Sequence, residues 1–507
     1  MTSVRGAMAR IAVLGLLGTG AVAAQYRNLS VDASAAKGVI RSFQAVDSGP
    51  VSILPGGPDL SARYKELHID LVRTHDLYGP TEIDSHFEEN FFRTLIPDPA
   101  KRGAFVREAN QSVIFPNADA NPESPESYNF KATDRVVSGI RAVGADVYFH
   151  VGRSFGATGV DKQPVDEAKY ATILKHVVMH YNKGWDHGMR GAVKYWAIWT
   201  EPEFPEFWSK PPERLFAFYD SLAHAVKSAD PTAKVGGIGK AFAYEPGPYR
   251  EGFLDYVAKN HAPLDFYTWN WFGSYSGDAY DPVVIAKQIR ELLDARGLQR
   301  TESHMAEWNI STDNSAPVRP IHESMMNAAF TGAVMSYLQD AAVSKALIYR
   351  GDSLPSGLFN SEGAPLKKFY AFKAMGEMLR TPRRLAVTGA DTIGFAALAG
   401  ISNDGKTIQI LISNHEIPKE LKPLHPKPAL KFQRVPIRTV EYKDNRGYKL
   451  TVDKLPWGKS GYTVKRYLLD QTHDFTQVED RAAKGASLEL SNELPPPSVE
   501  LITLQKR

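Results

Sequence analysis

Between residues 60 and 380, short apolar runs alternate with amphipathic stretches. Each apolar run has the length expected of a strand that is buried on both faces. The stretches between them repeat their apolar residues with a helical period, as in Pro212–Ala229, where Leu215, Phe218 and Leu222 share one face. The runs that we interpret as strands are His68–Arg73, Asp146–Val151, Tyr195–Thr200, Lys234–Gly237, Leu264–Trp269, Thr301–Glu307 and Ser344–Tyr349.

This alternation indicates the fold class of the larger part of the chain. Repeated strand–helix units over roughly 300 residues favour a (β/α)₈ barrel over a doubly wound sheet. No glycine-rich phosphate-binding fingerprint opens any of the predicted helices, which argues against a nucleotide-binding fold. We therefore predict an α/β protein with a (β/α)₈ TIM barrel over residues 61–382.

The pattern changes after about residue 382, where short β-type runs are separated by turn residues. Asn403-Asp404-Gly405 is typical of a hairpin turn between two such runs. Residues 383–507 are thus predicted to form an all-β, sandwich-like accessory domain. Residues 24–60 fit neither pattern and could add a strand to this β-domain, since chain termini often lie close together. The predicted β-domain strands are Thr392–Ala399, Thr407–Ser413, Tyr462–Leu469 and Val499–Leu504.

The first residues have the features of an export signal. Arg5 and Arg10 precede an apolar run from Ile11 to Ala23, and Ala21-Val22-Ala23 is a small-x-small cleavage pattern. We predict a signal peptide over residues 1–23 and export to the periplasm or the medium. The chain has no Cys, which excludes disulfides, thiolate metal sites and a cysteine nucleophile. An exported protein without disulfides is more typical of bacteria than of eukaryotes.

Composition narrows the choice of partners. Sixty basic and 57 acidic residues give a net charge of +3, without the basic patch that nucleic acid requires. No later apolar window is long enough to span a membrane. Aromatic residues make up 11% of the chain, and their rings are suited to stacking on the C–H faces of sugars. We expect no nucleic-acid or membrane partner and no cofactor, and the oligomeric state stays open.

Two predicted strands end in a glutamate with a tryptophan close by. Glu201 follows Trp199-Thr200, and Glu307 precedes Trp308. In a (β/α)₈ barrel the chemistry lies where the strands end. Cleavage of a glycosidic bond requires one carboxyl group that protonates the leaving oxygen and a second that stabilises the developing oxocarbenium ion. The two glutamates are therefore the candidate catalytic pair of a glycosidase.

The segments around this pair resemble a known family. Trp199-Thr200-Glu201-Pro202, continuing to Phe207-Trp208, is similar to the W-N-E-P…F-W segment of glycoside hydrolase family 39, which holds β-xylosidases and α-L-iduronidases. Val72–Asp76, Lys234–Gly237 and Glu307–Asn309 resemble further segments of the family, in family order.

The resemblance implies a role for each matched residue. Glu201 falls on the general acid/base and Glu307 on the nucleophile of a retaining mechanism. Arg73 falls on an arginine that hydrogen-bonds the nucleophile, and His75 is expected to line the sugar subsite. The implied activity is that of an exo-acting glycosidase on an oligo- or polysaccharide with xyloside-like, arabinoside-like or less usual sugars.

Four departures from the family pattern surround the pair. Thr200 stands where the family has an asparagine that binds the sugar 2-hydroxyl. Asn270 and Phe272 replace a His-x-Tyr pair, and Tyr275 could substitute for the missing tyrosine. Arg350 follows Tyr349 where a Tyr-Trp pair is usual, and it could pair with a sugar carboxylate or with Asp352. The predicted substrate-binding residues are Arg73, His75, Trp199, Thr200, Asn270, Trp271, Tyr275, Trp308 and Arg350.

Three alternatives stay open at this point. The first is a glycosidase of the same family that recognises a uronic acid through Arg350. The second is an inactive, carbohydrate-binding barrel, in which the departures mark lost catalysis. The third is a metal-dependent hydrolase, because His176 and His180 have the i, i+4 spacing of two ligands on one helix face. No Glu lies between them in the zincin arrangement, so we expect instead two exposed histidines on an outer helix.

Overall fold

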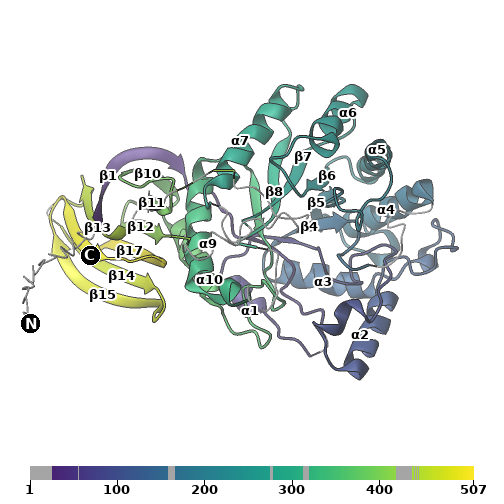
Figure 1. Cartoon of the computed structure of the whole chain (residues 1–507), viewed down its shortest axis with the longest axis horizontal. Helices are drawn as coiled ribbons and strands as arrows, with labels where there is room; N and C mark the ends of the chain where they lie inside the picture. Colours follow the sequence, from purple (N-terminus) through teal and green to yellow (C-terminus); the bar gives the residue numbers. More distant parts are fainter. Residues whose placement is uncertain are drawn as a thin grey trace, which may run out of the picture.

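The computed structural model describes residues 25–54, 56–157, 166–273, 278–311, 319–417, 437–438, 440, 442, 445–458 and 460–507. A closed barrel surrounded by helices lies beside a sheet of nine strands (Figure 1). The predicted signal peptide and Tyr275 lie outside the described residues.

The barrel consists of eight parallel strands in chain order, and the last pairs with the first. This closed arrangement, with helices between successive strands, confirms the predicted (β/α)₈ barrel. Its strands are β2 (Ala45–Asp47), β3 (Leu71–Arg73), β4 (Asp146–Val151), β5 (Val193–Ile198), β6 (Lys234–Lys240), β7 (Phe266–Phe272), β8 (Glu302–Asn309) and β9 (Lys345–Ile348).

The helices of the barrel pack their apolar faces against the outside of the strands. In α5 the buried residues include Leu215, Phe218 and Leu222, the positions that the helical period predicts. The helices are α1 (Ser61–Glu66), α2 (Pro99–Gln111), α3 (Lys131–Ala142), α4 (Glu167–Asn182), α5 (Pro212–Ala229), α6 (Phe253–Asn260), α7 (Asp281–Asp294), α8 (Arg319–Glu323), α9 (Met325–Tyr337) and α10 (Lys367–Glu377). Short 3₁₀ or π turns occupy Phe91–Arg93, Pro125–Ser127, Trp185–His187, Pro248–Gly252, Leu338–Asp340 and Met378–Arg380.

The barrel begins earlier than the boundary at residue 61 that we predict from the sequence. Its first strand, β2, covers Ala45–Asp47 and pairs with both β3 and β9. A strand of three residues is too short to show a period, so the sequence pattern does not reveal it. The correction matters because β2 carries a carboxylate, Asp47, into the barrel.

The second body is one curved sheet in the order β15-β14-β17-β12-β11-β10-β1-β13-β16. Strands from both ends of this order share one apolar core, and the Tyr448 hydroxyl of β13 donates to Glu500 of β17 at 2.7 Å. The sheet therefore folds over itself. Its strands are β1 (Gln25–Val39), β10 (Arg383–Thr388), β11 (Phe395–Ile401), β12 (Thr407–Asn414), β13 (Asn445–Asp453), β14 (Gly461–Leu469), β15 (Asp474–Lys484), β16 (Leu488–Glu493) and β17 (Ser498–Lys506).

The outer face of this sheet packs on the barrel helices α9 and α10 (Figure 1). Leu411 and Leu501 of the sheet belong to the same buried cluster as the barrel residues. The Ser413 hydroxyl donates to the carbonyl oxygen of Ala329 in α9 at 2.7 Å. The sheet thus supports α9 and α10, the helices that follow β8 and β9. Glu307 lies on β8, so the sheet supports the side of the barrel that carries this residue.

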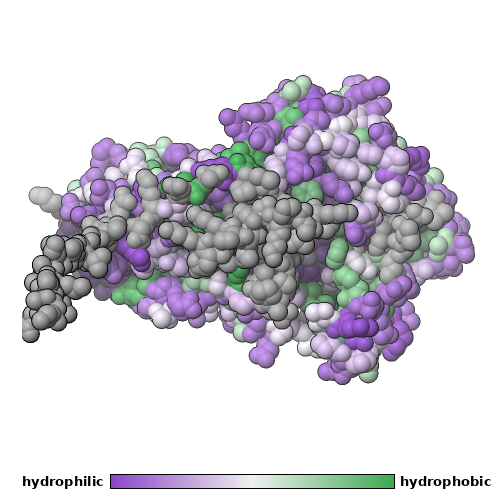
Figure 2. All heavy atoms as spheres, viewed as in Figure 1, coloured by the Kyte–Doolittle hydropathy of each residue, from purple (hydrophilic) through white to green (hydrophobic). Residues whose placement is uncertain are grey.

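The outer surface of the protein is mainly hydrophilic over the barrel helices on the face drawn in Figure 2. Within the part of the chain that the structure describes, no helix combines the length and apolarity needed to cross a membrane.

Candidate active site

Glu307 lies near the end of β8, and a bulge in that strand sets the direction of its side chain. Along β7 and β8, Trp269 pairs with Met305, whereas Asn270 pairs with Glu307, so Ala306 is an extra residue in β8. A bulge of this kind redirects the side chains that follow it. The Glu307 side chain reaches the interior of the barrel and is only 4% exposed.

The guanidinium group of Arg73 holds the Glu307 carboxylate. Nη1 of Arg73 donates to Oε1 of Glu307 at 2.6 Å and lies 2.9 Å from Oδ1 of Asp47. All three side chains are buried. Burial raises the pKa of Glu307 above its ordinary value, and the charge of Arg73 opposes that rise. Burial acts to lower the pKa of Arg73, but the two carboxylates raise it on balance, so the cation persists.

His75 lies beside the same carboxylate oxygen of Glu307 that Arg73 binds. Its Nε2 atom is 3.4 Å from Oε1 of Glu307, and its Nδ1 atom is 3.3 Å from Nδ1 of His150. Burial, reinforced by the charge of Arg73, lowers the pKa of His75 well below its usual value. His75 is therefore a neutral imidazole that borders the cavity beside the carboxylate.

Glu201 follows β5 on a strained stretch of backbone. Trp199 has φ of 65° and Glu201 has φ of 44°, a region that non-glycine residues rarely adopt. Strain of this kind concentrates at functional sites, where the surrounding structure holds it. The turn brings the partly exposed Glu201 side chain to the same cavity as Glu307.

Asn270 of β7 connects the two glutamates. Its Nδ2 atom donates to Oε1 of Glu201 at 3.0 Å. A hydrogen bond from the same amide also acts to lower the pKa of Glu307. Because only the NH₂ end of the amide can donate, the same –NH₂ group acts on both carboxylates.

The cavity that both glutamates line has a volume of about 880 Å³. This is within the range of small-molecule sites, about 300–1,000 Å³. Its floor contains Tyr349, whose hydroxyl donates to Oδ2 of Asp76 at 2.7 Å. Asp76 also accepts a hydrogen bond at Oδ1 from the backbone N–H of Phe155 at 2.9 Å. The cavity can therefore hold a small ligand against both carboxylates.

Arg350 borders this cavity, but its charge is already paired. Nε and Nη2 bind the two oxygens of Asp352 at 2.9 and 2.7 Å. Nη2 also donates to the carbonyl oxygen of Asp76 at 3.1 Å. Such a two-point pair, buried at 2% exposure, fixes the guanidinium as part of the floor. The expectation that Arg350 binds a sugar carboxylate is therefore not supported by its geometry.

A sequence model of the family described as Glycosyl hydrolases family 39 matches residues 127–383, about half of the chain. The chain belongs to this family. A glucosidase from Croceicoccus marinus is 33% identical, with a TM-score of 0.81 over 95% of this chain and 100% of that one. A family 39 enzyme from Xanthomonas axonopodis pv. citri is 17% identical, with a TM-score of 0.69 over 97% of this chain and 100% of that one.

Among curated proteins, a beta-xylosidase from Geobacillus stearothermophilus is 24% identical over 314 residues, which are 52% of this chain. The match spans 60% of the length of that beta-xylosidase. These relationships confirm the resemblance to family 39, a family of glycosyl hydrolases.

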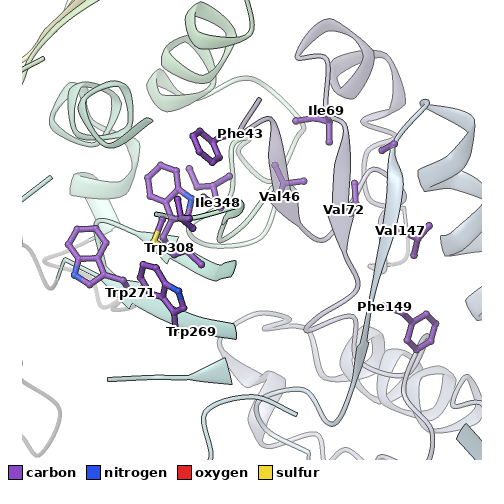
Figure 3. Packing of buried hydrophobic residues seen from close by; sticks show 14 of the residues in the cluster. Phe43, Val46, Ile69, Val72, Val147, Phe149, Trp269, Trp271, Trp308 and Ile348 are labelled. Atoms are coloured by element: carbon purple, nitrogen blue, oxygen red, sulfur yellow. The ribbon is translucent and has the colours of Figure 1, made fainter. Parts of the chain in front are cut away.

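Three tryptophans that we expected to contact the sugar are instead buried in the packing around the barrel strands. Trp271 stacks on Phe330 of α9, with ring centroids 5.7 Å apart. Trp308 belongs to the same cluster of buried apolar residues as these two rings (Figure 3). Successive side chains of a strand point to opposite faces, so a tryptophan next to an inward residue faces the helices. Trp199 is also buried, and its Nε1 atom donates to the carbonyl oxygen of Phe207 at 3.2 Å.

Thr200 and the two helical histidines also differ from expectation. Thr200 is 1% exposed and packs against Gly239. A Cβ atom added at Gly239 would lie only 2.6 Å from the hydroxyl oxygen of Thr200. His180 is stacked on Phe130 with ring centroids 3.6 Å apart, and its Nε2 atom is 3.1 Å from Asp134. His176 and His180 are buried, at 6% and 2% exposure, so the prediction of exposed histidines is wrong.

Three groups at this site are absent from our sequence-based predictions. Asp47 lies on the short β2 strand, and His150 meets His75 from β4. Asp76 belongs to the Val72–Asp76 segment that matches the family, so its position was a usable signal. Phenylalanine rings also line the cavity: Phe207 belongs to the segment that resembles the family, whereas Phe91, Phe155 and Phe242 belong to no motif in the sequence.

Proposed function

We propose that this chain is an exo-acting retaining glycosidase with Glu307 as nucleophile and Glu201 as general acid/base. The observation that carries the proposal is the different setting of the two carboxyl groups. Glu307 is buried and bonded to the Arg73 guanidinium, which favours its ionised form. Glu201 is partly exposed, accepts a hydrogen bond from the neutral amide of Asn270 and borders the cavity.

In the first step, Glu307 attacks the anomeric carbon, the glycosidic C–O bond breaks, and Glu201 gives its proton to the departing oxygen. A glycosyl ester on Glu307 results. In the second step, Glu201 takes a proton from water, the water oxygen attacks the anomeric carbon, and the ester bond to Glu307 breaks. The double displacement leaves the anomeric configuration unchanged.

The position of Asn270 supports retention. When both hydrogens of one –NH₂ group are donated over about 3 Å, the two acceptor oxygens lie about 5 Å apart. Retaining glycosidases hold their carboxyl groups about 5–5.5 Å apart, whereas inverting enzymes need about 6.5–9.5 Å to admit a water molecule. The hydrogen bond of Asn270 to Glu201 at 3.0 Å, together with the effect of the same amide on the pKa of Glu307, favours the shorter separation of a retaining enzyme.

We further propose that the sugar at the catalytic centre is neutral, with glucose as the first candidate. The glucosidase that is 33% identical supports this choice. The pairing of Arg350 with Asp352 removes the main reason to expect a uronic acid. A xyloside is the second candidate, supported by the 24% identical beta-xylosidase.

A panel of nitrophenyl glycosides, neutral and uronic, pyranosides and furanosides, tests these proposals, with proton NMR of the first-formed anomer. We expect turnover of a neutral glycoside with retention. Glu307→Gly should abolish turnover and azide should restore it as a glycosyl azide, while Glu201→Gln should slow substrates with poor leaving groups most. Glu489→Gln, on the exposed face of β16, is the matched control. An inverted first product would exclude Glu307 as nucleophile, and sugar binding without turnover would favour an inactive barrel.

Export stays a proposal, which rests on the apolar run Ile11 to Ala23 and the cleavage pattern at its end. Mass spectrometry of the protein recovered from a bacterial periplasm should give a mature N-terminus near Ala24. An intact N-terminus in the cytoplasmic fraction alone would contradict it.

A further inference from the structure

Phenylalanine rings form a wall at the mouth of the catalytic cavity. Phe91 and Phe155 lie with ring centroids 5.6 Å apart, and Phe155 continues to Phe207 at 6.1 Å. Phe204 and Phe242 form a second pair at 5.4 Å. All five rings border the same cavity as the two glutamates. We call these five residues the phenylalanine wall.

Two of these rings are unusually exposed. Among the described residues, four large apolar side chains are exposed, and two of them are Phe91 at 36% and Phe155 at 51%. The other two, Val39 and Val478, belong to strands of the β-domain. Adjoining exposed rings beside a cavity mark a surface that a ligand covers, unlike isolated exposed apolar residues.

The rings are held in place before any ligand arrives. Phe91 packs edge-to-face on Phe92, with centroids 4.9 Å apart and an interplanar angle of 90°. The backbone N–H of Phe155 is bonded to Asp76, which also binds Tyr349 on the cavity floor. Because these rings are already fixed by their contacts, a ligand that stacks on the phenylalanine wall causes little further loss of side-chain conformational entropy.

The wall lies on the side of the leaving group. The backbone N–H of Phe204 donates to the carbonyl oxygen of Glu201 at 3.0 Å, so the loop with Phe204 and Phe207 folds back on the acid/base residue. The acid/base protonates the oxygen that joins the sugar to its aglycone. The aglycone must therefore lie next to this loop when the bond breaks.

Building on the glycosidase function proposed above, we propose that the phenylalanine wall binds a planar, apolar aglycone. The preferred substrates are then glycosides of aromatic or polycyclic alcohols, not sugar chains. Phenylalanine has no hydrogen-bonding group, so the five rings themselves offer no hydrogen-bond partner to the hydroxyl groups of a second sugar. An aromatic aglycone loses no hydrogen bonds there and gains ring stacking and apolar burial.

Inhibition by methyl, phenyl and 2-naphthyl 1-thioglucosides, in both anomers, tests the wall without the influence of leaving-group acidity. We expect the inhibition constant to fall in that order, by about tenfold from methyl to naphthyl. Phe155→Ala should weaken the naphthyl compound about three- to tenfold and leave the methyl compound unchanged. Val478→Ala is the matched control, since it also removes an exposed apolar side chain but lies in the β-domain. Because Phe155 is half exposed, the variant should fold, and Phe155→Tyr should restore binding.

Equal inhibition by the three thioglucosides would overturn the proposal, as would tighter binding of a thio-linked disaccharide than of the naphthyl compound. An equal loss for methyl and naphthyl compounds in Phe155→Ala would also overturn it. Failure of the proposed glycosidase function gives a different result, namely no turnover of any nitrophenyl glycoside, and it leaves the binding series measurable by calorimetry.

Discussion

Arg73 and Asp47 form a buried ion pair through the same guanidinium nitrogen that holds the nucleophile candidate. Nη1 of Arg73 lies 2.9 Å from Asp47 and 2.6 Å from Glu307. Burial raises the pKa of Asp47 well above its ordinary value, with Arg73 opposing and Glu307 adding to that rise. The two carboxylates therefore compete for one cation, and Asp47 is a positioning residue that acts on Glu307 through Arg73.

Asp47→Asn should move the acidic limb of kcat/KM to lower pH. The amide can still accept a hydrogen bond from Arg73, but the competing negative charge is gone, so Arg73 stabilises ionised Glu307 more strongly and its pKa falls. A pH profile of kcat/KM measures this shift. Asp453→Asn, an exposed residue at the end of β13, is the control. A loss of activity with an unmoved acidic limb would mean that Asp47 has a structural role only.

His75→Gln should lower kcat/KM about 10- to 100-fold, the effect of losing a polar contact to a charged group. Burial keeps His75 neutral, since its pKa lies well below the usual value. The pH profile of the variant should therefore keep its shape, because no histidine ionisation is removed. A limb that disappears in the variant would show that His75 titrates during turnover and would contradict this assignment.

The long elements of the fold are predictable from the sequence because they contain several periods. The pattern predicts a helix over Pro212–Ala229, and α5 has those bounds. The strand β2 has three residues, fewer than any period requires, so both the strand and Asp47 escape prediction. The curved β-domain is only partly predictable, because β15 is largely exposed along its length and shows no alternation.

The candidate pair is predictable because each glutamate lies at or just after the end of an apolar strand, but its surroundings are not. Trp308 is adjacent to Glu307 in sequence, yet the two side chains leave β8 on opposite faces. The link from Asn270 to Glu201 joins residues 69 positions apart, and its register depends on the extra residue in β8. Such contacts depend on strand register, which local sequence does not report.

Asn270→Ala should shift the acidic limb in the opposite direction to Asp47→Asn. The hydrogen bond from Asn270 acts to lower the pKa of Glu307, so its loss should raise that pKa and move the acidic limb to higher pH. Loss of the contact to Glu201 should also lower kcat, by about tenfold. The same pH profiles measure both effects. An acidic limb that moves to lower pH would mean that the amide does not stabilise ionised Glu307.

Asp281 is the first residue of α7 and is buried. Burial, together with the charge of Asp278, raises the pKa of Asp281 to about 8. Its folded-state pKa thus lies above its unfolded value, so its contribution to stability is complete below pH 4 and is lost as the pH rises through 8. Within this window the loss is at most about 1.4 kcal/mol per pH unit.

Asp281→Asn should therefore be more stable than the wild type at alkaline pH, because the amide is not ionised and can still accept the hydrogen bond that the Asp278 N–H donates at 3.2 Å. Thermal unfolding at pH 5, 7 and 9 measures the difference in Tm, which should grow from pH 5 to pH 9. Asp294→Asn, at the exposed end of the same helix, should show no such trend. A Tm difference that stays constant with pH would show that Asp281 is ionised throughout the range and that its neighbours compensate for burial.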